Sequence, residues 1–248
     1  MNDAVAVVLA AGLGTRMKSD LPKVLVQVLG RPMIVYVLDA LEAVGITKTI
    51  VVVGYRADDV KQTLADRRGL QFALQAERLG TGHAVKMAQP LLVGHKGPVV
   101  VLAGDSPMIQ AVSLRKLLEH FERQRPACLL GTLHKANPFG LGRIVRDGKG
   151  EFAGIVEEKD ATDEQRRITE VNMSTYIFSG PDLLYALDHL KNENRQKEYY
   201  LTDCPGILRA EGKLVQALPV LQPCEALSIN NMDELSEVEA EMRRMGYH

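Results

Sequence analysis

The sequence AVAVVLAAGLGTRMKSDLPK, residues 4–23, joins an uninterrupted apolar run to a glycine-rich turn. The run at residues 4–10 lacks the alternation of a half-exposed strand. It therefore indicates a strand covered on both faces, as in a parallel sheet. Gly12 and Gly14 follow at once, and glycines let a backbone and its N–H groups approach a phosphate closely. This stretch predicts an α/β protein whose first strand ends at a phosphate-binding turn.

The turn departs from two familiar phosphate-binding motifs. Met17 stands where the fingerprint G-x-G-x-x-G needs its third glycine, and the pattern G-x-x-x-x-G-K-[ST] is missing. Arg16 can bind two phosphate oxygens through its planar guanidinium. Lys23 adds a positive point charge, and the rigid proline before it restricts the backbone there. Two cations near one turn suit a triphosphate whose leaving group is pyrophosphate. We favour this interpretation over a tight turn that merely carries surface cations.

The next hundred residues alternate between apolar runs and amphipathic segments, which predicts a mostly parallel sheet with helices on both faces. The predicted strands are residues 4–10, 49–54, 70–74 and 99–103, and the predicted helices are residues 33–45, 57–69, 81–92 and 113–124. Pro32 is expected at the first helical position.

The pattern changes after about residue 127, where strand-like pieces dominate. The predicted strands are residues 128–134, 142–147, 151–158, 169–179 and 213–220, and the predicted helices are residues 181–192, 201–212 and 231–245. Because no linker or composition break appears, we expect one domain over residues 1–248. Its nucleotide-binding half would cover about 1–126, its sugar-binding half about 127–230 and its C-terminal helix about 231–245.

Composition narrows the classes of partner. The formal net charge is −1 and no basic run occurs, which argues against a nucleic-acid partner. No apolar segment reaches the roughly 18 residues of a membrane span, and no basic region precedes the N-terminal apolar run. The three cysteines lack the spacing of a zinc site or disulfide framework. We therefore expect a cytoplasmic protein with reduced thiols and small-molecule substrates.

Two further motifs lie at the ends of predicted strands. Asp105, in the sequence AGDSP, could hold magnesium beside phosphates, or it could cap a helix. If it binds metal, a second ligand is expected far away in the sequence. Gln75 begins the motif QAERLGTGHA and is suited to read the edge of a base, with GTG opening a helix behind it. An ordinary loop and helix cap is the alternative for that segment.

Together these pieces resemble the sugar-nucleotide pyrophosphorylases. Within that family they resemble the uridyltransferase domain of the bacterial UDP-N-acetylglucosamine pyrophosphorylases, which is usually the N-terminal half of a bifunctional enzyme. The motifs that carry the resemblance are VVLAAGLGTRMKSDLPKVL, LQAERLGTGHAV, AGDSPMI, NPFGLGRIV, GIVEEKDATDEQRRITEVN and EYYLTD. They occur in the family's order over nearly the whole chain. The first is shared by many nucleotidyltransferases, whereas the QAE and IVE motifs are far more specific.

The resemblance implies the nucleotide-diphospho-sugar transferase fold, Rossmann-like in its first half. It also implies a magnesium-dependent reaction that makes UDP-N-acetylglucosamine and pyrophosphate from UTP and N-acetylglucosamine 1-phosphate. The nucleotide would contact Leu9, Ala10, Ala11, Gly12, Gln75, Gly80 and Thr81. The sugar would contact Gly104, Gly142, Glu157, Asn172, Tyr200 and Thr202. Magnesium would bind Asp105 and Asn230, while Arg16 and Lys23 would neutralise the departing pyrophosphate.

The sugar phosphate is already ionised near neutral pH, so no general base and no covalent intermediate is expected; alignment and charge neutralisation would suffice. The family's NTG motif is NMS here, a lysine common in relatives is Leu13, and Lys197 replaces a glycine. We expect no hexapeptide-repeat acetyltransferase domain, and a monomer or weak homo-oligomer. Two alternatives stay open: a nucleotidyltransferase for another base or sugar, and a non-catalytic sensor of sugar nucleotides.

Overall fold

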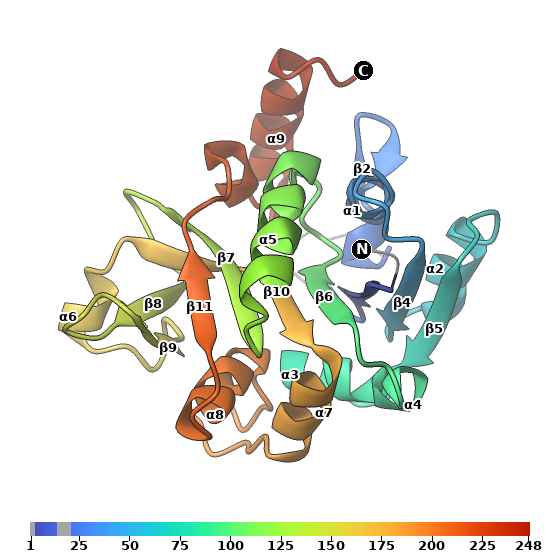
Figure 1. Ribbon diagram of the computed structural model, residues 1–248. Helices are drawn as coiled ribbons and strands as arrows, with labels where there is room; N and C mark the ends of the chain where they lie inside the picture. Colours follow the sequence, from blue (N-terminus) through green and yellow to red (C-terminus); the bar gives the residue numbers. More distant parts are fainter. Residues whose placement is uncertain (1–2, 14–20) are drawn as a thin grey trace.

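The computed structural model describes residues 3–13 and 21–248. Within these residues nine strands form one sheet, with the order β11-β7-β10-β6-β1-β4-β5 and the hairpin β8–β9 attached to β10 (Figure 1). The strands are β1 (Val5–Ala10), β4 (Lys48–Val53), β5 (Leu70–Leu74), β6 (Pro98–Ala103), β7 (Cys128–His134), β8 (Gly142–Arg146), β9 (Phe152–Val156), β10 (Glu170–Ser179) and β11 (Val215–Leu218). This architecture confirms the predicted α/β class.

The first half of the chain forms the parallel part of the sheet. Strand β1 lies between β4 and β6 and is parallel to both, with Leu9 opposite Val52 on one side and Ala103 on the other. Strand β5 extends the parallel order beyond β4. All four carboxyl ends therefore open at one edge of the sheet, where ligands of such folds bind.

The second half makes the sheet mixed. Strand β10 runs antiparallel to β6 and to β7, and β8 pairs with both β10 and β9 in antiparallel order. Strand β11 closes this side, parallel to β7. The long β10 thus joins the parallel part of the sheet to the β8–β9 hairpin, which begins at Gly142.

Helices cover both faces of the sheet because the central strands are apolar on both faces. The major helices are α1 (Met33–Glu42), α2 (Ala57–Thr63), α3 (Thr81–Met87), α4 (Gln89–Leu92), α5 (Ala111–Gln124), α6 (Asp163–Arg166), α7 (Gly180–Asp188), α8 (Cys204–Ala210) and α9 (Met232–Arg244). Ala6 and Val8 pack in one core with α1, α2 and α5, whereas Val7 packs in the other with α3, α7 and α8.

A third, smaller core holds the C-terminal helix. The two-stranded ribbon of β2 (Gln27–Val28) and β3 (Arg31–Pro32) packs with α9 through side chains that include Val28 and Val238. The Leu29 backbone N–H donates to Glu239 Oε1 at 3.0 Å. Figure 1 shows α9 at the same end of the molecule as the turn of the ribbon. This contact fixes the segment just before α9, which carries Asn230.

Several boundaries differ from the sequence predictions for local reasons. The predicted helix at residues 81–92 is divided into α3 and α4 because Pro90 lacks the N–H that a continuous helix needs. Residues 201–212 begin as a 3₁₀ turn (Leu201–Asp203) and become helical only at Cys204. Pro32 lies one position before α1, not in it. No helix in residues 3–13 and 21–248 is long and apolar enough to cross a membrane.

Candidate active site

A cavity of about 310 Å³ opens at the carboxyl ends of β1, β5 and β6. Its lining combines the predicted nucleotide residues with the predicted cation and metal residues, and includes Gly12, Lys23, Gln75, Gly80, Thr81 and Asp105. Arg78 and Ser174 also line it. The parallel register brings Gly12, Gln75 and Asp105 together, since they follow β1, β5 and β6, which end at the same edge of the sheet, whereas Ser174 comes from the antiparallel β10.

Lys23 and Asp105 line this cavity, and Asn230 contacts the Lys23 side chain. The Lys23 Nζ lies 2.7 Å from Asp105 Oδ2 and donates to Asn230 Oδ1 at 3.1 Å. Val24 and Leu25, which follow Lys23 in a short 3₁₀ turn, are buried and anchor its backbone. On the other side, the Gly104 N–H donates to the Leu9 carbonyl at 2.8 Å and ties the Asp105 segment to β1. The structure thus brings together residues that are far apart in the sequence.

The orientation of the Asn230 side chain follows from its partners. Its Nδ2 donates to Glu234 Oε2 at 2.9 Å, so its Oδ1 faces Lys23. The backbone N–H of Asn230 donates to the same carboxylate oxygen at 2.7 Å. Glu234 lies in the first turn of α9, where Asn231 caps the helix by accepting from the Glu234 N–H. Glu234 was not among the site residues predicted from the sequence, although the spacing N-x-x-E from Asn231 to Glu234 signals a helix cap.

Asp105 and Asn230 fit a magnesium ion. Their oxygens already lie around one cation, the Lys23 ammonium, and carboxylate and amide oxygens are suitable magnesium ligands. In the described part of the chain no three histidine, cysteine, aspartate or glutamate side chains form a metal-binding group. A magnesium ion here would therefore take most of its ligands from water and phosphate, as is usual for magnesium beside phosphates.

Gln75 is almost fully buried, and its amide is fixed by the loop that follows. Its Nε2 lies 3.1 Å from the Gly80 carbonyl oxygen and 3.1 Å from His83 Nδ1. A carbonyl oxygen only accepts, so the Nε2 must face it, and His83 Nδ1 then acts as the second acceptor. Both amide hydrogens are thereby used within the protein, and the Gln75 Oε1 is left as the acceptor for a ligand.

The loop after Gln75 packs against the segment that carries Tyr200 and Thr202. Gly80 has a φ of +106°, and a Cβ there would lie 2.5 Å from the Tyr199 carbonyl oxygen, so glycine is required. The Gly82 N–H donates to that same carbonyl at 2.8 Å, and the Leu201 N–H donates to Thr81 Oγ1 at 3.1 Å. The predicted nucleotide and sugar segments are therefore held against each other by backbone hydrogen bonds.

Three predicted sugar residues lie together where β8 begins, β9 ends and β10 is near its start. A side chain at Gly142 would come within 3.6 Å of both Glu157 Oε2 and Asn172 Cβ. Glu157 accepts from Thr202 Oγ1 at 2.9 Å, and burial raises the pKa of its carboxyl. Asn172 donates from Nδ2 to the Tyr176 hydroxyl at 2.7 Å. Each of these side chains thus has a fixed orientation before any ligand binds.

A second cavity, of about 460 Å³, lies beside this cluster and is lined by more acidic residues than basic ones, Lys191 being the one cation among the described residues that line it. Its lining includes Glu157, Asp160, Glu193, Tyr200, Thr202 and Asp203. The Tyr200 hydroxyl is buried and has no hydrogen-bond partner in the described residues, and burial raises its pKa to about 12. An acidic cavity repels phosphates but accepts hydrogen bonds from hydroxyl groups, so it suits the uncharged end of a sugar.

Asp203 provides a prediction about stability and pH. Burial, followed by repulsion from Glu157 and Asp160, raises its pKa from 3.8 to about 6. The pKa of Asp203 is higher in the folded protein than in the unfolded chain. Ionisation of this carboxyl therefore lowers the free energy of unfolding as pH rises from about 4 to 6, and the whole loss is present above pH 6. Asp203→Asn should therefore raise the free energy of unfolding by about 1–2 kcal/mol at pH 8 and have little effect at pH 4. Urea unfolding at the two pH values measures this, and an equal effect at both would contradict it.

A buried ion pair supports the hairpin that carries Gly142. Arg143 is 1% exposed, and its guanidinium donates to Glu158 Oε2 at 2.6 Å and to the Leu141 carbonyl. The same carboxylate oxygen accepts from the Gly140 N–H at 3.1 Å. Glu158, which directly follows Glu157, thus contacts the residues on both sides of Gly142. Neither Arg143 nor Glu158 was among the site residues predicted from the sequence.

Glu158→Ala should lower the free energy of unfolding by about 3 kcal/mol, because it leaves the Arg143 guanidinium buried without its counter-charge. Urea unfolding at pH 7 measures the change. Glu164→Ala, which removes an exposed carboxylate from α6, is the matched control and should change stability by less than about 0.5 kcal/mol. Similar values for the two variants would show that Arg143 does not depend on Glu158.

Some predicted residues lie apart from these contacts. Arg16 is outside the described residues. Leu9 and Ala11 line the cavity of about 310 Å³, which is the predicted nucleotide cavity, whereas Ala10 is buried in the core. Gly104 lies against the protein itself, since a Cβ there would come within 2.8 Å of the Leu9 carbonyl oxygen. Its predicted contact with the sugar stays a prediction.

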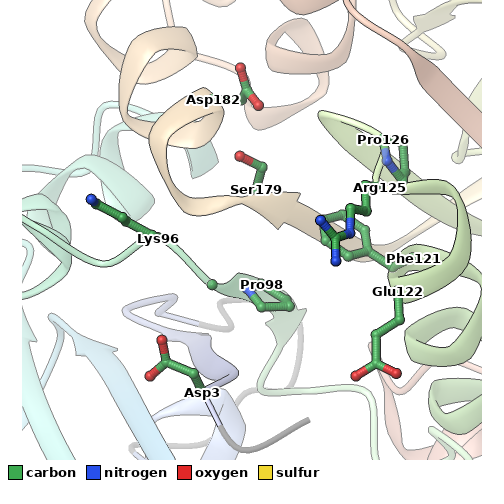
Figure 2. A pocket seen from close by; sticks show the side chains of 10 residues that line it. Asp3, Lys96, Pro98, Phe121, Glu122, Arg125, Pro126, Ser179 and Asp182 are labelled. Atoms are coloured by element: carbon green, nitrogen blue, oxygen red, sulfur yellow. The ribbon is translucent and has the colours of Figure 1, made fainter.

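A further cavity, of about 750 Å³, lies at the opposite edge of the sheet, where β6 begins and β10 ends. Figure 2 shows Lys96 and Arg125 on opposite sides of it, with Pro98 between them. Asp3, Glu122 and Asp182 also line it, so positive and negative side chains are mixed. None of the predicted site residues lines this cavity. The smaller cavity at the carboxyl ends is the candidate active site on chemical grounds.

At this edge of the α/β sheet Lys23 lies between two side-chain oxygens, close to the buried Gln75, and ligands of open α/β folds bind at such an edge. The model of the MobA-like NTP transferase domain matches residues 6–200, and the chain belongs to this family.

The chain is also similar to curated relatives in sequence and to a solved structure in fold. The bifunctional protein GlmU of Shouchella clausii is 44% identical over 244 residues, covering 98% of this chain and 53% of the relative. The bifunctional protein GlmU of Pelotomaculum thermopropionicum is 46% identical over 98% of this chain and 52% of the relative. The chain thus spans about half the length of these relatives. A UDP-glucose pyrophosphorylase complexed with UDP-glucose shares the fold, with a TM-score of 0.78, 17% identity and coverage of 98% of this chain and 99% of that one.

Proposed function

We propose that this chain transfers a uridylyl group from UTP to N-acetylglucosamine 1-phosphate, giving UDP-N-acetylglucosamine and pyrophosphate. The observation that carries the proposal is the meeting of Lys23 with Asp105 and Asn230 beside Gly12 and Gln75. This arrangement supplies a cation and two oxygen ligands where the phosphates of a nucleotide would lie. These three residues would therefore contact the reacting phosphates and not the sugar ring.

The charges of the two cavities support one direction of substrate binding. Among the residues that the structure describes, the nucleotide cavity has two cations, Lys23 and Arg78, beside Asp105 and Glu198, whereas the neighbouring cavity has four carboxylates and one cation, Lys191. A sugar phosphate would therefore point its hydroxyl groups towards Glu157 and its phosphate towards Lys23. That orientation brings the phosphate oxygen of the sugar towards the α-phosphate of the nucleotide, as a direct displacement requires.

The protein's own groups would align the substrates and neutralise charge. An ionised sugar phosphate needs no base to remove a proton, so attack on the α-phosphorus forms the new P–O bond as the bond to pyrophosphate breaks. Lys23 would stabilise the negative charge that develops on the leaving group. Asp105 and Asn230 would hold magnesium, which would neutralise phosphate charge when bound. We propose the same role for Arg16, which lies outside the described residues.

The choice of UTP and of the N-acetyl sugar rests on two supports. The free Gln75 Oε1 can accept a hydrogen bond from the ring N–H of uracil. The QAE and IVE motifs resemble those of the uridyltransferase domains of UDP-N-acetylglucosamine pyrophosphorylases. The curated relatives carry the name bifunctional protein GlmU. We place the reaction in the cytoplasm, where UTP and sugar phosphates are present, and propose that the chain acts as one domain.

Pyrophosphate release from the purified protein tests the proposal. UTP, CTP, dTTP and GTP are each combined with N-acetylglucosamine 1-phosphate, glucose 1-phosphate and galactose 1-phosphate in the presence of magnesium. Release should be fastest with UTP and the N-acetyl sugar. Faster release with another pair would assign a related nucleotidyltransferase. Binding of UDP-N-acetylglucosamine without release from any pair would support the non-catalytic sensor instead.

A further inference from the structure

Ser174 has an unusual backbone conformation for its place in the fold. Its φ is +53°, in the left-handed region that L-residues other than glycine rarely adopt. The other described non-glycine residues with positive φ are Leu29, Arg56, Arg125 and Lys197, and they lie in turns or at helix ends. Ser174 instead lies inside β10, in the middle of the sheet. Such strain persists only where the surrounding structure enforces it.

A bulge in β10 enforces this conformation. Asn172 pairs with Thr132 on β7, but the next pair is Thr175 with Gly131, so Met173 and Ser174 have no partner there. The Ser174 N–H donates to Asn172 Oδ1 at 3.2 Å, which closes the bulge onto the side chain of a predicted sugar residue. Bulges next to active sites commonly redirect one side chain into the site.

The bulge puts Ser174 at the boundary between the two halves of the site. Ser174 lines the nucleotide cavity together with Lys23 and Asp105, and it is joined through its backbone to Asn172 on the sugar side. Its hydroxyl has no hydrogen-bond partner in the described residues. A hydroxyl can both donate and accept, so it can serve an anionic phosphate oxygen or a sugar hydroxyl.

We propose that the Ser174 hydroxyl binds the sugar 1-phosphate directly, at the link between its sugar ring and its phosphate. This inference rests on the proposed function and adds a substrate-binding residue to it. The strained backbone is the consequence of directing that hydroxyl into the cavity from a central strand.

Ser174→Ala and Ser174→Gly separate the hydroxyl from the strain, because both remove the hydroxyl and only glycine relieves the strain. Both variants should raise the KM for N-acetylglucosamine 1-phosphate about fivefold to tenfold and leave the KM for UTP unchanged. Ser174→Gly should also raise the melting temperature by about 2–4 °C, whereas Ser174→Ala should leave it nearly unchanged.

A wild-type KM for the sugar phosphate in either variant would overturn the inference and leave the proposed function intact. Equal increases in both KM values would also overturn it, since they would indicate a general distortion of the site. Absence of turnover in the unsubstituted protein, measured in parallel, would overturn the proposed function and this inference together. The three results are therefore distinguishable in one set of assays.

Discussion

Asp105→Ala should lower the rate of pyrophosphate release by about three orders of magnitude and raise the magnesium concentration needed for half-maximal rate. Asp105 supplies the carboxylate of the proposed metal pair and is also the ion-pair partner of Lys23 at 2.7 Å. Its removal leaves Asn230 as the one remaining protein ligand in the proposed pair. A loss of about 4 kcal/mol of transition-state stabilisation corresponds to this decrease in rate.

Two controls keep this result interpretable. Asp58→Ala removes a carboxylate whose side chain is 96% exposed on α2, and it should leave the rate and the magnesium dependence unchanged. The melting temperature of the Asp105 variant should show that it is folded, because Asp105 lies at the edge of the sheet and outside the cores. A folded Asp105→Ala protein with wild-type magnesium dependence would remove Asp105 from the metal site.

Lys23→Met should lower the rate by about two to three orders of magnitude, but it should change the magnesium dependence in the opposite direction. The Lys23 ammonium contacts the two oxygens that we assign to the metal, at 2.7 and 3.1 Å. Without it, magnesium no longer competes with a fixed cation for Asp105, so a lower magnesium concentration should suffice. The rate still falls because the charge that stabilises the leaving group is lost.

The magnesium titration therefore distinguishes the two roles. A metal ligand and a leaving-group cation both lower the rate when removed, but only the ligand's removal weakens metal binding. Methionine retains the length and packing of the lysine side chain without its charge. A Lys23→Met protein that needs more magnesium than the wild type would contradict the proposed competition between Lys23 and magnesium. It would indicate that Lys23 instead helps the protein to bind magnesium.

The repeating parts of the fold could be predicted from the sequence because their signals are local. Strand β1 is apolar without alternation, and the predicted strands at residues 70–74 and 128–134 agree with β5 and β7 residue for residue. Hydrophobic periodicity also predicted α9, which begins at Met232. These elements depend on burial patterns within one segment, which a single sequence displays directly.

The contacts between segments distant in the sequence could be predicted less well. The Ser174 bulge depends on the register of β10 against β7, and register is a property of two strands. The Arg143–Glu158 pair was not expected, because charged residues are rarely buried and nothing local marks them. The pairing of Asp105 with Asn230 was expected from the family resemblance alone. The structure brings the two residues to Lys23, and their role towards a metal is part of our proposal.

The most direct test of the account follows the oxygen atoms of the reaction. N-acetylglucosamine 1-phosphate is labelled with a heavy oxygen isotope in its phosphate and incubated with UTP, magnesium and the protein, and the products are weighed by mass spectrometry. Direct attack of the sugar phosphate on the α-phosphorus predicts that all the label appears in UDP-N-acetylglucosamine and none in pyrophosphate. Label in pyrophosphate, or no labelled nucleotide sugar at all, would contradict the account.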